Sequence, residues 1–151
     1  MQKFSRDSFN ITEAINELMH ESGVIVIENA YNLNDIKEAK DIVNHFADIQ
    51  EPKETHFNAE AESSDKIKLQ QRIWNLFGKG EVFSKLITND IIFSLMSKVL
   101  GSEFFCGSYC ASRLLPGSIG QELHIDYPYW DFYNSETFPI GLNSSFAQNC
   151  Q

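Results

Sequence analysis

Apolar residues recur at helical spacing from residue 11 onward. A stripe over residues 11–19 follows Asn10, and Glu13 stands three residues after it, which is typical of a capped helix N-terminus. Gly23 is typical of a helix end, and the β-branched run over residues 24–27 has no helical gap. The pattern predicts an amphipathic helix followed by a short buried strand.

Three more helices are expected further along. Residues 33–47 carry an apolar stripe behind Asn32 as a possible cap. Residues 81–87 form a short helical stretch, and residues 90–100 form a longer one with Asn89 as its cap. Helices therefore dominate the first two thirds of the sequence.

After Gly101 the pattern changes from helical to extended. Residues 104–115 are rich in aromatic and small side chains, and Pro116 with Gly117 closes this run as a turn. Residues 121–126 then alternate polar and apolar. We predict a long strand, a turn and a second strand.

Residues 51–68 separate the second helix from the aromatic segment that follows. They are polar and charged, with almost no large apolar side chains. Long polar loops often carry function as lids. An ordinary solvated connection explains the composition equally well, and both interpretations stay open.

Composition excludes several classes of protein. The chain has 151 residues, 42% of them apolar, which is enough for one globular domain with a core. Its net charge of -9 repels a phosphate backbone, so nucleic acid is not expected as a partner. No window is long and apolar enough to span a bilayer, and the start of the chain lacks a signal-peptide core. We expect a cytoplasmic protein without a membrane partner.

Three cysteines are present, at positions 106, 110 and 150. Cys106 and Cys110 fall in one expected strand, where four residues span about 13 Å, which is too far for a disulfide. The cysteines are also too few, and too poorly spaced relative to histidine, for a structural zinc site. We expect buried free thiols in a reducing compartment.

His124 and Asp126 are the candidate chemistry of the sequence. Strand side chains alternate with period two, so both point to the face that Glu122 also occupies. Imidazole and carboxylate are two of the three ligands in the 2-His-1-carboxylate triad of Fe(II) oxygenases. The spacing alone is not specific, because a chance Asp two residues after a His is common.

The surrounding sequence is more specific than the spacing. Residues 113–126 read RLLPGSIGQELHID, with a strand, a Pro-Gly turn, Gln121 three residues before His124, and then Asp126. Upstream lie RIWNL at residues 72–76, a helix ending in Leu-Gly at 100–101, and GVIVI at 23–27. In this order, these segments resemble the phytanoyl-CoA dioxygenase family over nearly the whole chain.

The resemblance implies an α+β protein with a double-stranded β-helix core, which is jelly-roll and cupin-like. Residues 1–151 would be the N-terminal portion of one such domain, with a lead-in of helices and a strand over 1–101 and the start of the core over 102–151. It implies Fe(II) held by His124 and Asp126, 2-oxoglutarate as co-substrate, dioxygen, and hydroxylation of a small organic substrate. Asp126 favours hydroxylation over halogenation, since related halogenating enzymes lack that carboxylate. The substrate itself is not specified.

Further site residues follow from the same resemblance. Tyr127, Tyr129 and Trp130 would line the substrate pocket, although aromatic residues at this density are equally typical of a core. Gln121 would also line the substrate pocket, and Gln121 and Glu122 would support the ligands from outside the coordination sphere. Arg113 would bind 2-oxoglutarate, with a surface salt bridge as the alternative.

The family pattern also requires a distal His and a distal cation for the 2-oxoglutarate carboxylate. Residues 127–151 contain neither His nor Arg. His20, His45 and His56 precede the motif and are expected on a helix surface or in the polar loop. We therefore interpret the sequence as a truncated, fragmentary or split form of the enzyme that should not turn over.

An incomplete barrel has structural and functional consequences. It would expose a sheet edge, which predicts self-association. Two alternative functions remain open. One is a jelly-roll binding module without catalysis, and the other is a cupin-type metal protein that does not use 2-oxoglutarate.

Overall fold

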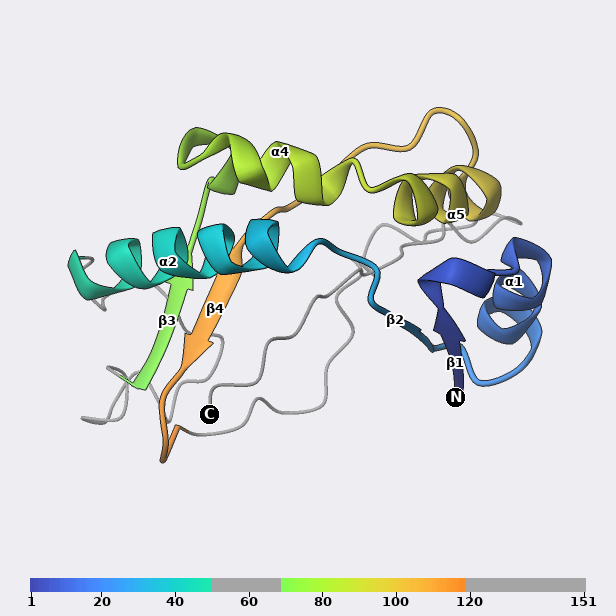
Figure 1. The fold of residues 1–151 in the computed structure, drawn as a ribbon, viewed down its shortest axis with the longest axis horizontal. Helices are drawn as coiled ribbons and strands as arrows, with labels where there is room; N and C mark the ends of the chain where they lie inside the picture. The colour runs from blue at the N-terminus through green and yellow to red at the C-terminus, as the bar shows by residue number, and fades with distance from the viewer. Residues whose placement is uncertain (50–68, 119–151) are drawn as a thin grey trace, which may run out of the picture. The chain divides into compact units, whose positions relative to one another are not determined.

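The computed structural model describes residues 1–49 and 69–118. Within these ranges the chain forms two compact units. The first unit combines residues 1–30 with 88–105, and the second combines residues 31–49, 69–87 and 106–118. The helices and strands of both are labelled in Figure 1.

The first unit contains a parallel pair of strands. β1 (Gln2–Ser5) pairs with β2 (Ile25–Glu28), and η1 (Arg6–Ser8) with α1 (Ile11–His20) connects them. Parallel strands cannot be joined by a tight hairpin, and the helix supplies the crossover. The strand expected at residues 24–27 is present at residues 25–28, whereas β1 was not expected from the sequence. The expected burial is wrong, because Ile25, Val26 and Ile27 are half-buried and Val24 is 46% exposed.

The N-terminus of α1 is built as the sequence predicts. Asn10 Oδ1 accepts hydrogen bonds from the backbone N–H of Thr12 (3.0 Å) and of Glu13 (3.3 Å), and Asn10 Nδ2 donates to Glu13 Oε1 (2.9 Å). These bonds satisfy N–H groups that have no partner inside the helix. Beyond the other end, Gly23 adopts a positive φ of 73° and its N–H donates to the carbonyl of Glu17.

The core of the first unit gathers α1, β1 and α5 (Asp90–Leu100). Phe4, Ala14 and Leu95 are buried at its centre. Asn89 caps α5 as predicted, accepting from the N–H groups of Ile91 (3.1 Å) and Ile92 (3.2 Å). The half-buried apolar residues packed around this centre are Phe9, Ile11, Ile15, Leu18 and Ile25.

In the second unit, one long helix packs on an antiparallel strand pair. α2 (Leu33–Ile49) contacts β3 (Gln70–Ile73), β4 (Ala111–Leu114) and α4 (Glu81–Ile87), and η4 (Leu76–Gly78) leads from β3 to α4. In Figure 1 the two strands cross beneath α2, and α4 runs beside it. Asn32 caps α2, since its Oδ1 accepts from the N–H of Asn34 at 2.8 Å.

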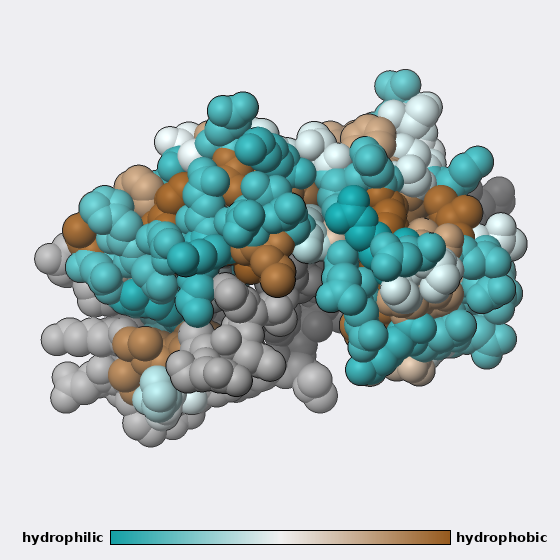
Figure 2. Space-filling model, in the orientation of Figure 1, coloured by the Kyte–Doolittle hydropathy of each residue, from teal (hydrophilic) through white to brown (hydrophobic). Residues whose placement is uncertain are grey.

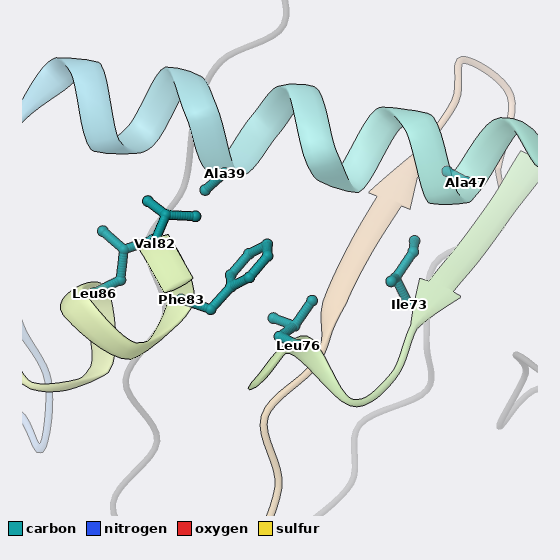
Figure 3. Close-up of a cluster of buried hydrophobic side chains, with 7 residues drawn as sticks. All are labelled: Ala39, Ala47, Ile73, Leu76, Val82, Phe83 and Leu86. Atoms are coloured by element: carbon teal, nitrogen blue, oxygen red, sulfur yellow. The ribbon is translucent and has the colours of Figure 1, made fainter. Parts of the chain in front are cut away.

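Seven buried side chains form the core of this unit. Val82, Phe83 and Leu86 of α4 gather beneath Ala39 of α2 in Figure 3, and Leu76 lies beside them. The remaining members are Ala47 and Ile73. The alanines let α2 approach closely, and Gly80 serves the same purpose, because a Cβ there would lie 2.8 Å from Ile42 Cδ1.

The outer face of α2 is polar. From residue 37 to residue 48 its exposed residues recur at helical spacing and are Lys37, Glu38, Asp41, His45 and Asp48, whereas the apolar Leu33 and Ile49 at the two ends of the helix are also exposed. Figure 2 shows this face as a largely hydrophilic surface. The amphipathic pattern predicted for residues 33–47 is therefore confirmed except at Leu33, which was counted in the apolar stripe and is 83% exposed.

The extended run after Gly101 is shorter as a strand than the sequence predicts. Only Ala111–Leu114 pair with β3, and residues 104–110 belong to no strand. A strand requires a hydrogen-bonding neighbour, and β3 offers only four residues for pairing. Composition cannot reveal the length of the partner.

This correction also changes the account of the cysteines. Cys106 lies outside any strand, so the predicted separation of about 13 Å loses its basis. Cys106 and Cys110 are both free, but Cys106 is exposed and Cys110 is half-buried, so the expectation of buried thiols is wrong for Cys106. Cys150 lies outside the described residues.

The expected double-stranded β-helix stays a prediction. Residues 1–49 and 69–118 hold helices and two small two-stranded sheets, and no jelly-roll is formed by that part of the chain. The polar loop at 51–68 and the strand expected at 121–126 lie outside the described residues. Self-association through an exposed sheet edge likewise stays a prediction.

Candidate functional site

Most of the predicted site residues lie outside the described part of the chain. They are His124, Asp126, Gln121, Glu122, Tyr127, Tyr129 and Trp130. Arg113 is the one described member, on β4. The structure therefore shows how the chain is held shortly before the proposed ligands.

β4 ends in a tight, hydrogen-bonded turn. The ladder continues one step past the strand, because the N–H of Leu115 donates to the carbonyl of Leu69 (2.8 Å). The N–H of Ser118 then donates to the carbonyl of Leu115 (3.1 Å). Pro116 and Gly117 occupy the two central positions, and Gly117 has a φ of 88°. This arrangement matches a type II turn, which favours Pro followed by Gly, as the sequence predicts.

The guanidinium of Arg113 is surrounded by acceptors from two elements. Its Nε donates to Gln71 Oε1 (2.7 Å), its Nη2 donates to Asp48 Oδ1 (2.8 Å), and its Nη1 lies 3.5 Å from Asn44 Oδ1. Gln71 is the direct cross-strand neighbour of Arg113 in the β3–β4 pair. Asn44 and Asp48 are one helical turn apart on α2.

Arg113 is mostly shielded, although its ion-pair partner is not. The Arg113 side chain retains 20% of its accessible surface, and Asp48 retains 66%. The sequence predicts a surface salt bridge as the alternative role of Arg113, and that salt bridge is formed with Asp48. Since all three guanidinium nitrogens face protein oxygens, Arg113 would have to give up these contacts before it could bind a dicarboxylate.

The described histidines lie on exposed helix positions. His20 is the last residue of α1, and His45 lies on the outer face of α2 with its ring edge-on to Phe46. His56 lies outside the described residues. Among residues 1–49 and 69–118, no three His, Cys, Asp or Glu side chains gather closely enough to hold a metal ion.

Tyr109 is a polar group that the sequence did not single out. Its hydroxyl donates to the carbonyl of Phe83 (3.2 Å), and its ring contacts Phe77 (5.2 Å between centroids) and Phe83 (6.2 Å). Burial, with smaller contributions from Tyr31 and Cys106, raises the pKa of Tyr109 well above its usual range. The feature of the sequence that indicates this contact of Tyr109 with Phe77 and Phe83 is the aromatic-rich run at residues 104–115.

The raised pKa of Tyr109 predicts a loss of stability at alkaline pH. The folded state holds the proton more tightly than the unfolded chain, so this contribution is complete below the ordinary tyrosine pKa of about 10. It is lost as the pH rises from there toward the folded pKa. We expect urea unfolding at several pH values above about 10 to show a steeper decline for the wild type than for Tyr109→Phe. An equal decline of stability with pH in the wild type and in Tyr109→Phe would contradict the raised pKa of Tyr109.

Comparisons with protein families, curated proteins and solved structures give no match for this chain. Among the residues that the structure describes, no helix has the length and apolar character needed to cross a membrane.

Proposed function

We propose that this chain carries part of a non-haem Fe(II)- and 2-oxoglutarate-dependent dioxygenase that hydroxylates a small organic substrate. The observation that carries the proposal is the sequence of residues 113–126, which resembles the metal-binding region of the phytanoyl-CoA dioxygenase family. β4 and the Pro116-Gly117 turn support it, because they occupy the places of the strand and turn that precede the ligands in this resemblance. The proposed ligands are His124 and Asp126.

The side chains of His124 and Asp126 are of the chemical types that bind Fe(II). A neutral imidazole and a carboxylate are donors that non-haem Fe(II) oxygenases use, and the triad keeps coordination positions open for an oxoacid and dioxygen. When bound together, iron and 2-oxoglutarate would activate dioxygen, which is the oxidant that hydroxylates the C–H bond while 2-oxoglutarate is oxidised to succinate and carbon dioxide. The chain would orient the two donors, and Asp126 would also neutralise one positive charge of the metal.

The third ligand is not assigned to a residue. Residues 127–151 offer no His, and the described His20 and His45 are exposed on helices. We therefore propose a site to which this chain contributes two protein ligands. Water or a residue from another chain would complete the coordination.

Fe(II) affinity with and without 2-oxoglutarate tests the proposal. The measurement is an anaerobic competition titration of the chain against a chromophoric Fe(II) chelator. We expect 2-oxoglutarate to tighten Fe(II) binding, because a bidentate oxoacid and the protein share the same metal ion. Fe(II) binding that is indifferent to 2-oxoglutarate would favour the cupin-type alternative, and no binding at all would favour the non-catalytic module.

A further inference from the structure

β4 is hydrogen-bonded to β3 along one of its two edges. The register of the pair, and the bond from the N–H of Leu115 to the carbonyl of Leu69 (2.8 Å), show that Arg113 and Leu115 direct their backbone groups toward β3. The backbone groups of Ser112 and Leu114 alternate with these and point to the opposite edge. In the described part of the chain, they have no hydrogen-bond partner there. β4 therefore presents an edge of backbone donors and acceptors.

This edge of β4 is accessible to solvent. Ser112 is exposed, and Leu114 is 62% exposed. Their side chains lie on the sheet face turned away from α2, because the alternate residues Ala111 and Arg113 contact the buried core and α2. Backbone N–H and C=O groups at an accessible strand edge favour pairing with a further strand. The chemistry of the edge thus specifies an extended segment as its partner.

We propose that β4 pairs with β4 of a second copy of this chain, antiparallel and about a twofold axis. The pairing would join the two-stranded β3–β4 sheets of both copies into one continuous sheet. A twofold axis presents the same edge on both partners, so each outward N–H of one copy faces an outward carbonyl of the other. The edge is in this sense complementary to itself.

The side chains of β4 select one register for this pairing. Centring the pair on Arg113 would place two arginines directly opposite each other, and like charges in this position are unfavourable. Centring it on Leu114 would place Ser112 opposite Pro116, whose nitrogen has no hydrogen to donate. Centring it on Ser112 avoids both, because Arg113 then lies opposite Ala111 of the second copy. The register centred on Ser112 is therefore the one that we propose.

The same register produces an apolar contact on the sheet face away from α2. Leu114 of each copy would lie opposite Cys110 of the other, and Cys110 is half-buried in the single chain. Tyr109 and Ala111 both pack against the core, as the alternation of an extended segment through Cys110 requires. The contact would remove part of the exposed surface of Leu114 from water. It adds to the backbone hydrogen bonds and leaves the ion pair of Arg113 with Asp48 in place.

Proline at position 112 tests the pairing selectively. Ser112→Pro removes an outward N–H and keeps the hydrogen bonds between β3 and β4, because those use the alternate residues. Ser112→Ala is the matched control, since it keeps the N–H. We expect the wild type and Ser112→Ala to dimerise, and Ser112→Pro to raise the dissociation constant of the dimer about tenfold or more, because each copy loses one donor. Sedimentation equilibrium measures these constants.

A second variant does not alter the backbone. Leu114→Lys places a charge on the accessible edge and removes the contact with Cys110 of the other copy, so we expect it to weaken the dimer about tenfold as well. Circular dichroism and urea denaturation verify that both variants are folded. Dimers of Ser112→Pro and Leu114→Lys that are as tight as the wild-type dimer would overturn the proposal, and so would a wild type that stays monomeric at every concentration.

Amide hydrogen exchange, followed by NMR, locates the paired edge. The amides of Ser112 and Leu114 should exchange freely in dilute protein and become protected as the protein concentration rises. The amide of Arg113 faces β3 and should be protected at all concentrations. Protection of Ser112 and Leu114 that does not depend on concentration would mean that the edge is covered within one copy, and it would overturn the proposal.

Discussion

Replacing Phe83 with alanine is expected to lower the free energy of unfolding by about 3–5 kcal/mol, the range typical of truncating a buried aromatic residue. The Phe83 side chain is only 1% exposed, and it lies among the side chains that join α4 to α2. The change would leave a cavity that the alanines of α2 cannot fill, and it would also remove the edge-on contact with Tyr109. Urea denaturation followed by circular dichroism measures the effect.

Phe77→Ala is the matched control for this prediction. Phe77 contacts the same Tyr109 ring, but 51% of its surface is exposed. Its truncation should therefore cost much less, since little apolar surface leaves water when Phe77 packs. Similar losses for the two variants would contradict the assignment of Phe83 to the core of the second unit.

The second large effect concerns the proposed iron ligands. His124→Ala and Asp126→Ala are each expected to weaken Fe(II) binding by about 100-fold or more, because even partners outside the ligand sphere contribute about 10–100-fold in metal sites. The two variants should be about equally affected, since each removes one of only two protein ligands. Anaerobic equilibrium dialysis against Fe(II) gives the affinities.

His45→Ala is the control for the loss of an imidazole. His45 is exposed on α2, and the proposal gives it no contact with metal. Its removal should leave Fe(II) affinity unchanged. An equal loss in His45→Ala and His124→Ala would mean that surface histidines bind the metal non-specifically.

The helices of the fold could be predicted because their signals are local. Asn10, Asn32 and Asn89 each accept hydrogen bonds from backbone N–H groups at the start of the helix that the sequence assigned to them. A cap acts within a few residues of itself, so its pattern is visible in sequence. The Pro116-Gly117 turn was predictable for the same reason.

The strands were harder to predict because pairing depends on distant residues. β1 carries the polar residues Gln2, Lys3 and Ser5 with a single buried side chain, Phe4, and only its pairing with β2 makes it a strand. The opposite error occurred after Gly101, where an apolar run suggested a strand along its whole length. Partner length, which composition does not encode, limited β4 to Ala111–Leu114.

The candidate site also combines features that local sequence predicts with features that depend on distant residues. The alternation of His124 and Asp126 and the segments that resemble the oxygenase family are local patterns, and from them a metal site was predicted. The contacts of Arg113 could not be predicted from the sequence, because Gln71 and Asp48 lie 42 and 65 residues away from it along the chain. Nor could the hydrogen bond from Tyr109 to the carbonyl of Phe83 be anticipated.

The most direct test of the proposed function is the visible absorption of the anaerobic chain with Fe(II) and 2-oxoglutarate. A chelated 2-oxoglutarate–Fe(II) complex gives a weak metal-to-ligand charge-transfer band. We expect this band in the wild type and in His45→Ala, and we expect it to be absent in His124→Ala. A band that survives in His124→Ala, or a wild-type chain that binds Fe(II) and 2-oxoglutarate without one, would contradict the assignment of His124 and Asp126 as ligands of a 2-oxoglutarate-dependent iron site.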